Sequence, residues 1–200
     1  RLNAEIYDML SAPALALVLR LPDVSKVLDV GSGEGAHSEI LSKVFEDVRS
    51  VDINPRVNPT YLGDFVTSEV SSEYDLVWAS HVLEHQPNVN MFLTKCFDIL
   101  KEGGYLAVTV PPLKHEVVGG HLTLWNPGVL LYNLILAGFD CGKAKVRTEG
   151  YNISVVVKKK SFDMPRLNYD FGDIETLSRY FPFKARQGFD GRIASINWDV

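Results

Sequence analysis

The chain has 200 residues, of which 46% are apolar and 22% charged, as in an ordinary globular protein with enough core for one domain. Its 25 acidic and 20 basic side chains give a formal net charge of −5, which disfavours a nucleic-acid backbone as partner. The two cysteines, Cys96 and Cys141, have no paired metal spacing, so we expect neither a disulfide framework nor a zinc finger, and a cytoplasmic location is the default.

The first predicted element is an N-terminal helix over residues 2–19, because apolar side chains recur there at roughly helical spacing. Its longest apolar run, residues 12–19, is far shorter than the roughly 20 residues of a membrane span. Acidic rather than basic residues precede this run, which disfavours a signal peptide. The chain begins at Arg1 instead of Met, which suggests that a few residues precede it.

Short apolar runs then alternate with helical patterns. Strands are predicted over 26–30, 48–52, 60–62, 74–79 and 105–110, and helices over 35–45, 88–100 and 127–137. This alternation predicts a mostly parallel α/β sheet with helices on both faces. Pro55 and Pro59 interrupt the short connection after Asp52, so the crossover helix there is at most one turn long.

The end of the chain departs from the alternation. Residues 143–148 and 151–158 read as two strands joined through Glu149-Gly150, so they form a hairpin and the last strand is antiparallel to its neighbour. The segment 161–200 is unusually rich in aromatic residues, and we expect it to pack on something. We therefore predict a domain over residues 1–160 and a C-terminal extension over 161–200 that packs on this domain or forms a homodimer interface.

The strongest motif is VLDVGSGEG at residues 27–35, a strand that runs into a glycine-rich turn and a helix. Glycines let the backbone turn tightly and let a ligand approach the N–H groups at the start of the helix. Asp52 ends the next strand, where a carboxylate can accept two hydrogen bonds from the hydroxyls of a ribose. A nucleoside cofactor is favoured over a turn that only packs a helix against a strand.

Gly31, Gly33 and Ala36 also match the dinucleotide pattern G-x-G-x-x-G/A, so the nucleoside has to be argued separately. Asp29, just before the glycines, would repel a pyrophosphate but could contact the methionine amine of S-adenosylmethionine. The terminal hairpin is not typical of a dinucleotide fold, and 200 residues leave little room for a separate substrate domain. These features favour S-adenosylmethionine over NAD.

The chain resembles the class I S-adenosylmethionine-dependent methyltransferases over roughly residues 24–160. The segments that carry the resemblance are VLDVGSGEG, SVDINP, YLGDF, YDLVWASHVLEH and LKEGGYLAVTVPP. The resemblance implies a Rossmann-like sheet of seven strands, mostly parallel, with an antiparallel last strand. It also implies methylation of a small molecule.

Roles carried over from this resemblance concern first the cofactor. Asp29, Gly31, Gly33 and Gly35 would hold its methionine portion. Asp52 would bind the ribose and Ile53 would lie against the adenine. Asp64 and Phe65 would meet the adenine amino group and ring face. Ser80 and His81 would face the reactive centre.

Histidines are the candidate proton acceptors, because methyl transfer needs a base only where the acceptor must lose a proton. We name His81, His115 and His121 as the candidates. His115 and His121 lie in the predicted loop 111–126, at the edge of the sheet where open α/β folds bind ligands, which makes this loop a possible lid. Other roles for these residues are packing and a structural part in the turn.

Residues 81–85 also match the metalloprotease pattern H-x-x-E-H. That metal reading needs a long helix and a third ligand, whereas this segment follows a strand and meets Pro87 almost at once. We therefore expect no metal. The resemblance implies instead that Glu84 and His85 help to shape the acceptor side, and the alternative is a structural role in which they cap or bond the turn.

The acceptor itself is not encoded in a motif. The block GGHLTLWNPGVLLYNLILAGFD at 119–140 and the final segment resemble enzymes of bacterial surface-carbohydrate clusters, so a sugar or surface-carbohydrate precursor is one candidate. Two alternatives stay open at this point. The first is a small NAD-binding Rossmann protein, and the second is a module that binds S-adenosylmethionine without catalysis.

Overall fold

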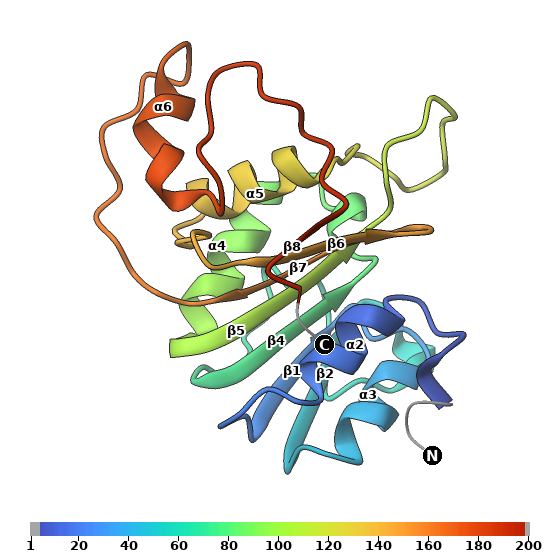
Figure 1. Cartoon of the computed structure of the whole chain (residues 1–200). Coiled ribbons are helices and arrows are strands. Elements are labelled where there is room, and N and C mark those ends of the chain that lie inside the picture. Colours follow the sequence, from blue (N-terminus) through green and yellow to red (C-terminus); the bar gives the residue numbers. More distant parts are fainter. Residues whose placement is uncertain (1–4, 199–200) are drawn as a thin grey trace.

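The computed structural model describes residues 5–198, which form one eight-stranded sheet with helices on both faces (Figure 1). The strand order is β3-β2-β1-β4-β5-β7-β6-β8. The five parallel strands are β1 (Lys26–Val30), β2 (Asp47–Asp52), β3 (Tyr61–Leu62), β4 (Tyr74–Ser80) and β5 (Leu100–Val110). The antiparallel pairings join β7 (Asn152–Lys158) to β5 and to β6 (Lys145–Glu149), and β8 (Ser195–Ile196) to β6.

This topology confirms the predicted Rossmann-like α/β fold and the hairpin that places β7 antiparallel to its neighbours. The sheet has one strand more than the seven that the resemblance implies. The additional strand is β8, which comes from the C-terminal segment and pairs Ile196 with Val146.

The helices form two layers (Figure 1). One layer contains α2 (Ala12–Val18) and α3 (Ala36–Ser42), and the other contains α4 (Val89–Ile99) and α5 (Pro127–Leu136). Because strand side chains alternate between faces, Leu28 and Val30 of β1 join the core on the α4 and α5 side, while Val27 joins the core on the α2 and α3 side. No helix within residues 5–198 is long and apolar enough to cross a membrane.

The N-terminal helix predicted over residues 2–19 is wrong in its extent. Glu5 and Ile6 are helical, a turn follows, and α2 begins only at Ala12; residues 2–4 lie outside the described part of the chain. The break occurs at Ser11, whose φ of 61° is left-handed and cannot continue a helix. This conformation lets the Ser11 amide donate a hydrogen bond to Asn152 Oδ1 at 3.2 Å.

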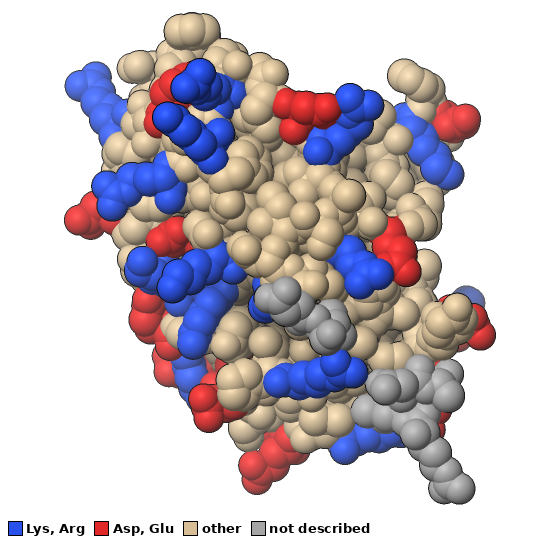
Figure 2. Space-filling view, in the orientation of Figure 1, with Lys and Arg blue, Asp and Glu red and all other residues tan. Residues whose placement is uncertain are grey.

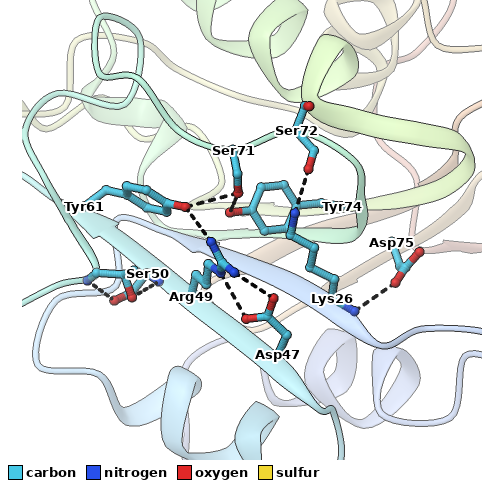
Figure 3. Close-up of polar contacts among 10 residues, drawn as sticks. Lys26, Asp47, Arg49, Ser50, Tyr61, Ser71, Ser72, Tyr74 and Asp75 are labelled. Atoms are coloured by element: carbon cyan, nitrogen blue, oxygen red, sulfur yellow. Dashed lines mark hydrogen bonds and ion pairs between the residues drawn. The ribbon is translucent and has the colours of Figure 1, made fainter.

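The connection after β2 contains only the 3₁₀ turn Pro55–Val57, so no crossover helix covers β3. A polar network holds this strand instead (Figure 3). The Tyr61 hydroxyl accepts a hydrogen bond from Arg49 at 3.0 Å and donates to Ser71 at 3.1 Å, and Ser71 in turn bonds the Tyr74 hydroxyl at 2.8 Å. Burial raises the pKa of Tyr61, but the hydrogen bonding that it shares with Ser71, Tyr74 and Arg49 outweighs this effect and lowers the pKa to about 7.

The C-terminal segment packs over α5 and continues to the sheet edge (Figure 1). Leu177 at the end of α6 (Asp173–Leu177) is buried with Phe181 in the same core as α4 and α5. The rings of Phe162 and Tyr180 stack with centroids 3.9 Å apart. On the face seen in Figure 2, basic and acidic side chains are interspersed around an uncharged central area.

Candidate active site

The glycine-rich turn after β1 has the backbone conformation that its residues predict. Gly31, Gly33 and Gly35 have φ values of 70°, 52° and 84°, a region in which residues with a Cβ are strained. A Cβ on Gly33 or Gly35 would meet nothing within 4 Å, so open space adjoins both residues. A Cβ on Gly31 would lie 2.7 Å from Val82, so this glycine also allows a close contact with the segment after β4.

Asp52 faces this turn from the end of β2. Its Oδ2 accepts a hydrogen bond from the Gly33 amide at 2.8 Å, and its Oδ1 accepts one from the Asn54 amide at 2.8 Å. Each carboxylate oxygen can accept a further bond, so a fixed acceptor pair is presented beside the turn. This is the arrangement that the two hydroxyls of a ribose require.

Asp29 lies behind the turn and is 2% exposed. Its Oδ2 accepts a hydrogen bond from the Ser38 hydroxyl at 2.6 Å. Burial raises the pKa of Asp29 to about 7, the bond from Ser38 opposes this rise, and the charge of Asp52 adds to it. The carboxyl group is therefore poised to ionise when a positive charge approaches.

A cavity of about 390 Å³ adjoins the turn and has the size of a small-molecule site. It is called the cofactor cavity below, after the residues in its wall that are predicted to bind the cofactor. Several predicted cofactor residues meet in its wall: Gly31, Asp52, Ile53, Asp64, Phe65 and His81. Ile53 is 73% exposed and presents an open apolar surface, and the buried ring of Phe65 is held edge-to-face against Phe92 at 5.1 Å. Asp64 fixes its own loop, because its Oδ1 accepts the Val66 amide at 2.8 Å.

These residues fit the cofactor that the sequence predicts. The open space at Gly33 and Gly35 allows close approach to the backbone, and Asp52 supplies paired acceptors for hydroxyl groups. Ile53 and Phe65 supply apolar surface for a base. These acceptors and apolar surfaces match the hydrogen-bond donors, the ribose hydroxyl groups and the flat adenine ring of S-adenosylmethionine.

Ser80 and His81 follow different paths from the end of β4. The Ser80 hydroxyl lies 2.6 Å from that of Ser11, so Ser80 contacts the N-terminal segment instead of lining the cavity. The His81 ring stacks on Tyr151, with centroids 5.7 Å apart and planes inclined by 7°. Its Nε2 bonds Asn152 Oδ1 at 2.9 Å, and its Nδ1 lies 3.3 Å from Glu84 Oε1.

Burial lowers the pKa of His81, but hydrogen bonds to Glu84 and Asn152 and the charge of Glu84 outweigh this effect and raise it. Both ring nitrogens are engaged. His81 is therefore better placed to hold its neighbours in position than to accept a proton from a substrate.

His115 and His121 do not line the cofactor cavity. They line a second cavity of about 210 Å³ within the loop between β5 and α5, which is called the loop cavity below. Tyr151 lies in the same wall. His115 is exposed, whereas the ring of His121 packs against that of His85 with centroids 5.0 Å apart. His85 belongs to the wall of the cofactor cavity, so the two cavities adjoin at this pair of rings.

The sequence did not indicate Asn152, Tyr151 or Ser11 as parts of this region. A signal for the first two does exist in the chain. Because β7 is antiparallel, its first residue lies at the edge where the parallel strands end, and the turn at Gly150 marks that start. Ser11 carries no comparable signal.

Both free cysteines are buried, and burial raises the pKa of Cys96 and of Cys141 well above the usual range. Cys96 belongs to the core, as its apolar neighbours predict. Neither thiol is available for chemistry at the site.

Comparison with known proteins gives a matching family and several relatives. Residues 4–133 match the family described as "Methyltransferase domain". The Ubiquinone biosynthesis O-methyltransferase of Proteus mirabilis is 30% identical over 97 residues, covering 40% of this chain and 40% of its own length. The mitochondrial enzyme of that name from Rattus norvegicus is 30% identical over 103 residues, covering 42% of this chain and 30% of its own length. The chain thus spans well under half the length of these curated relatives.

Solved structures show the same fold at low identity. The 1,6-didemethyltoxoflavin-N1-methyltransferase of Burkholderia thailandensis superposes with a TM-score of 0.62 at 16% identity, covering 74% of this chain and 77% of its own. A SAM dependent methyltransferase from Archaeoglobus fulgidus gives a TM-score of 0.60 at 16% identity, covering 72% and 90%.

The family match covers more than half of the chain, and it decides between the readings that the glycine motif alone left open. The NAD-binding alternative has no support in the family match. The chain belongs to the methyltransferase-domain family, within the class I S-adenosylmethionine-dependent methyltransferases, as its motifs predict.

Proposed function

We propose that this protein transfers the methyl group of S-adenosylmethionine to an oxygen of a small-molecule acceptor, with a sugar or surface-carbohydrate precursor as a candidate acceptor. The observation that carries this proposal is the contact between the cofactor cavity and the smaller loop cavity at His85 and His121. The O-methyltransferase names of the relatives from Proteus mirabilis and Rattus norvegicus support an oxygen acceptor.

Residues at the two cavities have different roles in the proposed reaction. S-adenosylmethionine, when bound, supplies an electrophilic sulfonium methyl group. Asp52 and the glycine turn hold the nucleoside, and Asp29 supplies negative charge behind the turn. In-line displacement depends mainly on holding the acceptor oxygen close and collinear, which is the task of the loop cavity. His115 and His121 in its wall are the candidate acceptors of the hydroxyl proton.

The loop between β5 and α5 is suited to exclude water from this step. Its apolar side chains Val117, Leu122 and Leu124 are 98%, 61% and 60% exposed, so they are free to cover an acceptor. The Leu122 amide donates to the carbonyl oxygen of Glu84 at 2.8 Å, which keeps the loop beside the cofactor cavity.

Calorimetric titration with S-adenosylhomocysteine tests the cofactor part of the proposal, and we expect saturable binding. Absence of heat, together with tight binding of NADH in a parallel titration, would overturn it. Transfer of a labelled methyl group to sugars, nucleotide sugars, phenols and amines then tests the acceptor. Cofactor binding with no transfer to any of them would favour the non-catalytic module.

The chain is proposed to consist of a domain and a C-terminal extension. We assign the transferase domain to residues 1–160 and the C-terminal extension to residues 161–200. The extension presents Tyr169 and Phe171, which are 83% and 75% exposed, as a candidate homodimer surface. Light scattering of the wild type and of the double variant Tyr169→Ser, Phe171→Ser tests this: a dimer that the variant loses is expected, and a monomeric wild type would refute it.

A further inference from the structure

Three side chains with metal-binding atoms meet where the two cavities adjoin. One ligand atom each of Glu84, His85 and His121 lies within 4.8 Å of the other two. Glu84 and His85 belong to the 3₁₀ turn Leu83–His85 after β4, and His121 comes from the loop between β5 and α5. Backbone hydrogen bonds from Leu122 and Thr123 to the Glu84 carbonyl oxygen, at 2.8 and 3.3 Å, hold the two segments together.

The carboxylate of Glu84 is the first observation that points to a cation. Its side chain is 1% exposed, and Oε1 lies 3.3 Å from His81 Nδ1. Its other oxygen, Oε2, is buried and has no hydrogen-bond partner among the described residues. A buried carboxylate oxygen without a partner is costly, and a bound cation would remove that cost.

The ring of His85 supplies the second observation. Its Nδ1 lies 2.8 Å from the carbonyl oxygen of Gly120. Because a carbonyl oxygen can only accept, Nδ1 is the donor of this bond, which leaves Nε2 as the ring atom that can serve as a metal ligand. That Nε2 lies 3.8 Å from Glu84 Oε1, on the side of the cluster. An outer partner that fixes the ring in this way is typical of histidines that bind metals.

Gly120 makes this contact possible. A Cβ at this position would lie 3.0 Å from His85 Nδ1, and the residue has a left-handed φ of 82°. A residue with a side chain would therefore disturb both the backbone of the loop and its bond to His85.

We propose that Glu84, His85 and His121 form a binding site for a divalent transition-metal cation of the zinc class. Two imidazoles and one carboxylate are a ligand set that Zn²⁺ uses when one coordination position is left open for a reactant. The ligand atoms need to draw closer than their present separation, and His121 can do so because it lies on a surface loop. His81 positions Glu84 in this arrangement and is not itself a ligand.

This ligand set differs from the metal reading of the H-x-x-E-H pattern at residues 81–85. That reading required a long helix carrying two histidines and a third ligand of unknown position. The structure replaces the helix with adjacent residues on one 3₁₀ turn and takes the third ligand from a loop far along the chain.

The chemical consequence rests on the proposed function. The cluster joins the cofactor cavity, through His85, to the loop cavity, through His121, so a metal held there would lie beside both cavities. A Zn²⁺ ion there would bind the oxygen of an acceptor hydroxyl and lower its pKa. Because His121 would then be a metal ligand, the hydroxyl proton would pass to His115, the other candidate acceptor in the wall of the loop cavity, and the oxygen would remain as the nucleophile. The acceptor class that fits is thus an alcohol or a phenol rather than an amine.

Calorimetric titration of the chelator-treated protein with ZnCl₂ tests the site directly. We expect one zinc per chain, with the affinity reduced by roughly tenfold or more in Glu84→Gln and in His121→Ala. His115 is a histidine of the same loop that lies outside the cluster, so His115→Ala is the matched control. We expect this variant to bind zinc with unchanged affinity. MgCl₂ should compete poorly, because imidazole ligands favour zinc over magnesium.

Two outcomes would overturn the proposal. One is a wild type that binds no zinc, and the other is zinc binding that neither Glu84→Gln nor His121→Ala weakens, which would mark adventitious surface binding. S-adenosylhomocysteine is titrated into every variant without metal. Retained binding there shows that a failed metal site leaves the cofactor site intact, whereas loss of cofactor binding in the wild type would count against the proposed function instead.

Discussion

Asp52 is the residue that we propose to bind the ribose of the cofactor, and its carboxylate joins the end of β2 to the glycine turn. Asp52→Ala is expected to weaken S-adenosylmethionine binding by more than about tenfold, since each hydrogen bond to a charged group contributes roughly 1.5–3 kcal/mol. Calorimetry measures the effect. Asp47→Ala, at the opposite end of the same strand, is the control and should bind like the wild type.

Asp52→Asn removes the negative charge of the side chain but keeps its size and one acceptor oxygen. Its affinity should lie between those of the wild type and Asp52→Ala. Equal affinity of all three proteins would contradict the role given to Asp52. Unfolding of each variant is followed by circular dichroism to ensure that the turn at Gly33 still folds.

Asp29 makes stability depend on pH in a direction opposite to that of most carboxylates. Its pKa is raised from 3.8 to about 7 by burial, so the folded chain holds a proton that the unfolded chain has lost. The contribution to stability is fully present below pH 3.8 and is lost as the pH rises through about 7. Between these values, the free energy of unfolding of the wild type should fall with pH more steeply than that of Asp29→Asn.

Urea unfolding of both proteins between pH 4 and pH 8 measures this difference. The variant keeps an oxygen that can accept the Ser38 hydroxyl, so the comparison isolates the titration. Parallel pH profiles for the two proteins would show that Asp29 ionises normally.

At the scale of elements, α5 and the C-terminal segment are joined through two glycines. The Gly128 amide donates to the Gly191 carbonyl oxygen at 2.8 Å, and a Cβ on Gly128 would lie 2.7 Å from Gly191 Cα. Gly128→Val should therefore cost about 1–3 kcal/mol of unfolding free energy, because backbone cannot move aside as a flexible side chain can. Val129→Ala, an exposed neighbour, should change stability by less than about 0.5 kcal/mol.

Denaturant unfolding of both variants checks this prediction. A Gly128→Val protein as stable as the wild type would mean that the segment is not held against α5 in solution. The same result would remove the physical basis for a close fit between Gly128 and the ring of Phe189.

The elements that the sequence predicted well are those in which local pattern and tertiary environment agree. The bounds of β1 match the prediction, because an apolar run ends at glycines whose backbone conformation stops the strand. The start of β5 was missed because Gly103 and Gly104 resemble a turn, whereas the strand runs through them from Leu100. A Cβ on Gly104 would lie 3.0 Å from the Tyr74 carbonyl oxygen, so close strand contact explains this glycine.

Two further misses have long-range causes. The break at Ser11 depends on its bond to Asn152, which no local pattern shows. β8 is only two residues long, and its pairing with β6 is decided by the path of the whole C-terminal segment. In the same way, the residues predicted to bind the cofactor come from contiguous motifs, whereas the meeting of His121 with Glu84 and His85 depends on how a loop folds back.

At the scale of the molecule, the carboxyl ends of the parallel strands gather the proposed ligand contacts on one edge of the sheet (Figure 1). Ligand binding there stabilises the whole fold. At a concentration about 100 times its dissociation constant, S-adenosylhomocysteine adds about 2.7 kcal/mol. For a chain of this size this is a rise of roughly 5–10 °C in the midpoint of thermal unfolding. Calorimetric scanning measures it, NADH at the same concentration serves as the control, and equal shifts with both ligands would contradict a site specific for the proposed cofactor.

The pairing of β8 with β6 also bears on how the protein behaves at high concentration. The outer strands on both sides of the sheet, β3 and β8, are two residues each, so neither offers a long backbone edge of its own. Long, open border strands act as templates for pairing with other chains, and very short ones do not. By pairing with Val146 and Arg147, β8 thus covers the middle of β6 and reduces the backbone that β6 offers for edge-to-edge pairing with another chain.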